Sequence, residues 1–206
     1  QTMQQAFGAW ARQTPYQVFV PEEPLALSPK ERREEWPAQT GYAMIGFPSV
    51  RLAHPDLYAL DVLAGIAGQG RSSRLYETVV RAKQLAHVIS ASDYTPCDPG
   101  VFTIYVRAEP AKLSDAVEAS LRVLEDIARH GVAPAELKKA QRQVTAERVF
   151  HRQTVESVAN DLANSMAQTG DPEFSSRYVE GINRVTLEQV QSAAQRYCDR
   201  TRMTVV

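Results

Sequence analysis

The segment "HPDLYALDVLAGIAGQGRSSRL", residues 54–75, joins an apolar run to a glycine-rich loop. Its apolar residues crowd most sides of a helical wheel, which is typical of a buried helix. One of the glycines after the run would end that helix, because glycine readily adopts a positive φ. A serine would then cap a second helix. We therefore expect a structural loop between two helices, formed by Gly68, Gly70, Ser72, Ser73 and Arg74.

Gly65 and Gly70, followed by Arg71 and Ser72, fall one substitution short of the phosphate-binding motif G-x-x-x-x-G-K-[ST], because Arg71 replaces the lysine. A phosphate-binding loop of this kind needs a strand before its glycines. The residues before Gly68 have the pattern of a helix instead. The planar guanidinium of Arg71 is also no substitute for the compact ammonium of lysine. The sequence therefore argues against nucleotide binding.

Composition excludes several other classes of function. The 206 residues carry a formal net charge of −1, with acidic and basic residues mixed along the chain. This balance does not indicate nucleic acid or an anionic surface as a partner. The sequence contains no run of 18 apolar residues, so it predicts no membrane span. Cys97 and Cys198 have no zinc-site spacing. The chain opens on Gln1 rather than Met, so we expect an excised or processed piece.

The remaining segments predict an α+β fold. A short helix at 1–12 and a proline-rich connector at 14–37 come first, and Ser28–Glu31 could cap one helical turn within the connector. The other predicted strands are at 42–47, bounded by Gly41 and Pro48, and at 85–95, 100–108 and 202–206. The other predicted helices are at 73–83, at 113–130, at 135–168 with a break near His151, from Asp171, and from Thr186 to Tyr197.

No complete catalytic set is present in the sequence. None of the four histidines stands in H-x-x-E-H or H-x-x-x-H, and no G-x-S-x-G elbow occurs. The carboxylate pairs, such as Glu34–Glu35, lie in charged runs typical of a solvated surface. We therefore expect no metal and no cofactor in this chain.

Four segments together, in this order along the chain, resemble a known family. They are "HPDLYALDVLAGIAGQGRSSRLYETVVRAKQLAHVISA", "DPGVFTIYV", "GVAPAELKKAQ" and "INRVTLEQVQSAAQRYCD". This series is similar to the pitrilysin/insulinase-type zinc metallopeptidases, which include mitochondrial processing peptidase. The resemblance implies that residues 1–206 form one roll-like domain, with a small, mostly antiparallel sheet packed against several helices. It further implies that several such units enclose an unfolded peptide in a chamber.

Active members of that family carry an inverted zinc motif, H-x-x-E-H, in their first domain, and this chain lacks it. The chain therefore resembles the C-terminal, non-zinc unit. That unit supplies an Arg and a Tyr to the substrate from a segment like "LR-x-x-x-x-L-x-Y". Here "VRAKQLAH" puts Arg81 one residue closer than the pattern requires and His87 at the Tyr position. The resemblance thus implies substrate-binding roles for Arg81 and His87; otherwise they are a helix-end cation and a strand-face histidine.

The resemblance implies a function for the whole chain. We expect the non-catalytic half of a zinc metalloendopeptidase, inactive alone, which completes a peptide-binding chamber. Its expected partners are a zinc-bearing domain or subunit and an unfolded peptide. A catalytically inactive scaffold subunit is the alternative. Homodimer formation and the cellular compartment, bacterial periplasm or cytoplasm, are left open.

Overall fold

The computed structural model describes residues 2–11, 21, 24 and 28–206. Their strands form a five-stranded sheet in the order β1-β5-β2-β4-β3, with every neighbouring pair antiparallel except β1 and β5. The strands are β1 (Lys30–Glu31), β2 (Gly41–Pro48), β3 (Val88–Tyr94), β4 (Val101–Ala108) and β5 (Thr204–Val205).

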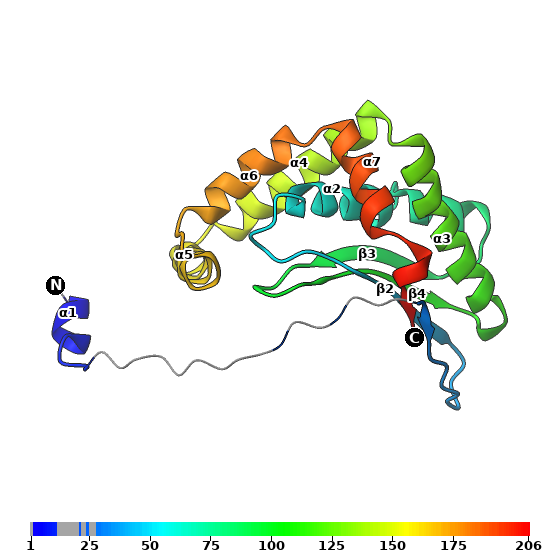
Figure 1. The fold of residues 1–206 in the computed structure, drawn as a ribbon, viewed down its shortest axis with the longest axis horizontal. Coiled ribbons are helices and arrows are strands. Elements are labelled where there is room, and N and C mark those ends of the chain that lie inside the picture. The colour runs from blue at the N-terminus through cyan, green and yellow to red at the C-terminus, as the bar shows by residue number, and fades with distance from the viewer. Residues whose placement is uncertain (1, 12–20, 22–23, 25–27) are drawn as a thin grey trace.

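Helices cover one face of this sheet (Figure 1). Helices α2 (Leu57–Gly68) and α3 (Leu113–His130) contact the sheet. Helices α4 (Pro134–His151) and α6 (Phe174–Arg184) pack on α2, α7 (Leu187–Tyr197) packs on α2 and α3, and α5 (Val155–Thr169) packs on α6. A short helix, α1 (Thr2–Phe7), lies at the N-terminus, apart from the sheet (Figure 1). A π-helix, η1 (Tyr76–Ala82), and two short 3₁₀ turns, η2 (Pro110–Lys112) and η3 (Arg200–Arg202), complete the elements. The predicted α+β fold is confirmed.

The core lies between the sheet and α2. Alternate residues of β2 and β4 face the helices and are fully buried, among them Ile45, Phe47, Phe102 and Ile104. This alternation is the expected pattern of an antiparallel sheet with one covered face. The residues between them, such as Tyr42, keep part of their surface exposed on the opposite face.

Helix α2 is buried on almost every side, as its apolar pattern predicts. Gly68 at its C-terminal end allows a close approach to β3. A Cβ atom added at Gly68 would lie 2.0 Å from the backbone nitrogen of Ala91. The turn continues through Gly70 with φ of +79°, a conformation that glycine adopts without strain. The predicted helix before the glycines is therefore confirmed.

Three local predictions need correction. Ser28–Glu31 forms no helical turn, since Lys30–Glu31 is strand β1, paired with β5 through a hydrogen bond from the Lys30 nitrogen to the Met203 oxygen of 2.9 Å. The helix after the loop is a π-helix over Tyr76–Ala82. The helix expected at Asp171 begins at Phe174. Each depends on partners far along the chain or on exact backbone hydrogen bonding, which short-range patterns do not show.

Other boundaries agree with the sequence. The long helical stretch breaks after His151, where α4 ends, and α5 begins at Val155. The capping box of Thr186 and Gln189 opens α7 as predicted. Much of the connector predicted at 14–37, namely 14–20, 22–23 and 25–27, lies outside the described residues, as do both ends of the helix predicted at 1–12.

Candidate functional site

The loop between α2 and η1 is fixed to two other helices. Arg74 donates to Glu136 on α4 through two nitrogens, at 2.7 and 2.8 Å, and to Asp126 on α3 at 3.0 Å. The Arg74 pairing lowers the pKa of Glu136 below its usual range. The buried Ser73 hydroxyl donates to the Gly70 oxygen at 2.8 Å, and Lys139 on α4 donates to Ser72. These contacts hold the loop against the protein body.

Arg81 and His87 both lie at the surface near the start of β3. The Arg81 guanidinium pairs with Glu77 one turn earlier, at 3.0 Å, and its side chain is 72% exposed. His87 is exposed, and its backbone nitrogen donates to the Arg107 oxygen at 2.8 Å. No hydrogen bond or ion pair joins the two side chains within the described part of the chain.

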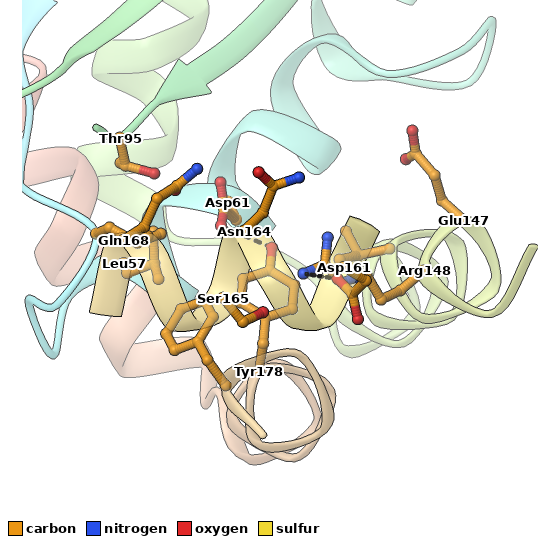
Figure 2. Close-up of a pocket in the computed structure, with 13 residues that line it drawn as sticks. Leu57, Asp61, Thr95, Glu147, Arg148, Asp161, Asn164, Ser165, Gln168 and Tyr178 are labelled. Carbon is orange, nitrogen blue, oxygen red and sulfur yellow. Dashed lines mark hydrogen bonds and ion pairs between the residues drawn. The ribbon is translucent and has the colours of Figure 1, made fainter. Parts of the chain in front are cut away.

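A pocket of about 440 Å³ lies on the helical side of the fold, away from Arg81 and His87. The side chains that line it come from α2, α4, α5 and α6 and from loops before α2 and after β3, and several of them are labelled in Figure 2. Its polar lining residues are Asp61 on α2, Thr95 after β3, Glu147 and Arg148 on α4, Asp161, Asn164, Ser165 and Gln168 on α5, and Tyr178 on α6. The apolar ones are Leu52, Leu57, Val144 and Phe174.

Asp61 is the unusual group of this pocket. Its carboxyl accepts a hydrogen bond from the Tyr178 hydroxyl at 2.7 Å, shown as a dashed line in Figure 2. Burial raises the pKa of Asp61 to about 7, Asp93 on β3 adds to the rise, and Tyr178 and Arg148 oppose it. Burial and the Asp61 charge likewise raise the pKa of Tyr178. The pair therefore keeps its protons at a pH where an exposed aspartate is ionised.

The only cation that lines the pocket, among the described residues, is already engaged. Arg148 pairs with Asp161 at 3.2 Å, donates to the Ser175 hydroxyl at 2.8 Å, and lies 5.5 Å from the centre of the Tyr178 ring. Arg152 also pairs with Asp161, at 3.4 Å. Asp61 is thus left with a hydroxyl partner and no ion pair among the described residues.

The sequence analysis did not single out Asp61, Arg148 or Tyr178. One signal was present: Asp61 is the only charged residue in the otherwise apolar α2. A lone carboxylate in a helix that is buried all round must meet a partner or shift its pKa. Its partner Tyr178 lies 117 positions away and could not be identified without the tertiary structure.

A metal centre finds no support in the described residues. No group of three or more His, Cys, Asp or Glu side chains there is arranged to hold a metal ion. Within the same residues, no helix is both long and apolar enough to cross a membrane.

Comparison with known proteins finds one matching family model and relatives that are named as zinc proteases. Residues 1–144 match the family model described as the peptidase M16 inactive domain. An uncharacterized zinc protease of Mycobacterium tuberculosis is 27% identical over 143 residues, which cover 69% of this chain and 33% of that protein. The chain thus spans about a third of the length of such curated relatives.

Solved structures share the fold. A protease from Helicobacter pylori superposes with a TM-score of 0.86 at 20% identity, covering 98% of this chain and 50% of that one. A peptidase M16 inactive domain from Pseudomonas fluorescens gives 0.78 at 18% identity, covering 93% and 45%. At these identities the likeness concerns the fold.

Proposed function

Since this chain belongs to the peptidase M16 family, as an inactive domain of zinc protease-like proteins, we propose that it completes the peptide-binding chamber of a zinc metalloendopeptidase. In this role it positions an unfolded peptide, and a zinc-bearing partner domain or subunit hydrolyses it. The observation that carries the proposal is the match to the inactive-domain model in a chain whose sequence lacks H-x-x-E-H.

The exposed side chains on the uncovered face of the sheet support the proposal that this chain forms one wall of the chamber. Tyr42 and Met44 on β2 are 56% and 50% exposed. The ring of Tyr42 lies 6.4 Å from that of Tyr105 on the adjacent β4. Aromatic and thioether side chains make contacts that tolerate many peptide sequences. A wall of this kind suits an unfolded substrate better than a small molecule of fixed shape.

The proposal is tested by reconstitution. The chain is produced alone, with the zinc-bearing domain, and compared with that domain alone in a peptide-cleavage assay. We expect chelator-sensitive cleavage only when both parts are present. Equal cleavage by the zinc-bearing domain alone would contradict the proposed role.

Arg81 and His87 are the proposed contacts to the substrate carbonyl. In the reconstituted enzyme, Arg81→Ala should lower kcat/KM about 10- to 1000-fold, the range for loss of one charge-stabilising donor. His87→Ala should lower kcat/KM about tenfold, because an imidazole is a weaker donor than a guanidinium. Arg184→Ala is the matched control, since Arg184 makes a similar exposed pair with Glu180 on α6. Wild-type rates in both site variants would show that the segment has no role in catalysis.

A scaffold subunit without proteolysis is the second candidate. It is favoured by His87 in the Tyr position and by the pairing of Arg81 with Glu77. In that case the chain would bind its partner stably, while the reconstituted pair would show no chelator-sensitive cleavage.

A further inference from the structure

We propose that the pocket lined by Asp61 is a binding site for a primary ammonium group on an apolar stem, as in a lysine side chain or a free aliphatic diamine. The inference goes beyond the proposed function, because a free amine would bind here whether or not the chain contacts a peptide substrate.

The charge of the lining selects a cation. Two carboxyl groups that line the pocket, those of Asp61 and Glu147, have no ion pair among the described residues, whereas Asp161 is paired with both Arg148 and Arg152. Once Asp61 is ionised, an anionic ligand would meet two carboxylates without an ion pair, whereas a cation would supply the ion pair that Asp61 lacks.

Hydrogen-bond acceptors complete an ammonium site. An ammonium group has three N–H donors and no acceptor. The carboxyl of Asp61 can take one of them. The side chains of Asn164 and Gln168, one turn apart on α5, make no hydrogen bond to any described residue, although both line the pocket. Their amide oxygens are therefore free to accept the others.

The apolar part of the lining suits the stem. Four apolar side chains line the pocket beside the polar groups, those of Leu52, Leu57, Val144 and Phe174. A chain of methylenes would remove this surface from water, which is favourable for apolar groups. A volume of about 440 Å³ lies within the range of small-ligand pockets and leaves room for a chain the length of a lysine side chain.

Binding should be coupled to the ionisation of Asp61. The groups that face Asp61 are Asp93 from β3, Arg148 from α4 and Tyr178 from α6. With its pKa at about 7, Asp61 is mainly protonated at pH 6 and mainly ionised at pH 8. A bound cation stabilises the ionised form. Affinity for an amine should therefore rise about tenfold from pH 6 to pH 8, over which the amine itself stays protonated.

The experiment is calorimetric titration of the chain with 1,5-diaminopentane and, separately, with N-acetyl-lysine methylamide at pH 6 and pH 8. Pentane-1,5-diol and glutarate are the neutral and anionic controls. We expect saturable binding of an amine at pH 8, about tenfold weaker binding at pH 6, and none of either control. Tighter binding of the lysine derivative assigns the site to a peptide side chain, and tighter binding of the diamine assigns it to a free amine.

Variants locate the site. Asp61→Asn should weaken amine binding at least tenfold and remove its pH dependence, while Asp115→Asn, the same charge change at an exposed position on α3, should leave it unchanged. Gln168→Leu, on the exposed wall of α5, should weaken binding severalfold without affecting folding. No saturable binding of either amine at pH 8, or equal binding by Asp61→Asn, would overturn the proposal.

Discussion

Two charged side chains, one within α2 and one in the loop after it, have opposite surroundings. Arg74, in the loop after the helix, meets two carboxylates and forms a two-point pair with one of them, Glu136. Asp61, within the helix, meets only the Tyr178 hydroxyl and has no ion pair among the described residues. Pairing with Arg74 lowers the pKa of Glu136, whereas burial raises the pKa of Asp61.

The difference separates two uses of buried charge. A paired charge with its hydrogen bonds satisfied contributes to the position of a loop and offers nothing to a ligand. An unpaired carboxyl that lines a pocket is held at a cost to stability, and perturbed groups of this kind are concentrated at functional sites. The contacts of Arg74 support the prediction that the loop is structural, and the proposed amine would supply the ion pair that Asp61 lacks.

The largest effect is expected at Gly68, on the structural side of this comparison. Gly68→Ala would place a methyl group 2.0 Å from the Ala91 nitrogen, so α2 or β3 would have to shift. We expect a loss of about 3–5 kcal/mol in the free energy of unfolding, measured by urea denaturation. Gly65→Ala in the same helix, whose added carbon would be 3.4 Å from its nearest neighbour, should change stability by less than about 1 kcal/mol. Similar losses in both variants would show that the close packing is not the cause.

The paired cluster itself is broken by Arg74→Met. The change leaves Glu136 and Asp126 without their partner in a partly covered site, so we expect a loss of about 2–3 kcal/mol at pH 7. Because pairing lowers the pKa of Glu136, its contribution is present at neutral pH and disappears as the pH falls and the carboxyl is protonated. Arg81→Met, which breaks an exposed pair, should cost less than about 0.5 kcal/mol. The idea fails if the two variants are equally stable.

The contribution of Asp61 to stability should depend on pH in the opposite direction to that of Glu136. In the folded chain Asp61 keeps its proton up to a pKa of about 7, whereas the unfolded chain loses it near 3.8. The contribution of Asp61 to stability therefore falls as the pH rises between these values. Asp61→Asn removes this penalty, so the stability of the variant relative to wild type should rise by about 1–2 kcal/mol from pH 4 to pH 8. This is less than the full pKa shift implies, because the Asp61 residue is not completely shielded from solvent. A difference that does not change with pH would show an ordinary, solvated carboxylate.

Much of the architecture followed from local patterns. The apolar crowding of α2, the alternation in β4 and the capping box at Thr186 each identify an element, because helix and strand periods are properties of short segments. The resemblance carried by "GQGRSSRL" and the later segments pointed to the family that the comparisons established.

What the sequence determined by itself was therefore the class of fold, most of its elements and the absence of the zinc motif. Only the tertiary structure decided which charges meet. Strand β1 forms because residues 30–31 reach β5 at the other end of the chain. Asp61 meets Tyr178 because α6 packs against α2. Arg148 is instead paired with Asp161 on α5, which also pairs with Arg152. Such encounters are set by the packing of whole helices, and no short-range pattern records them.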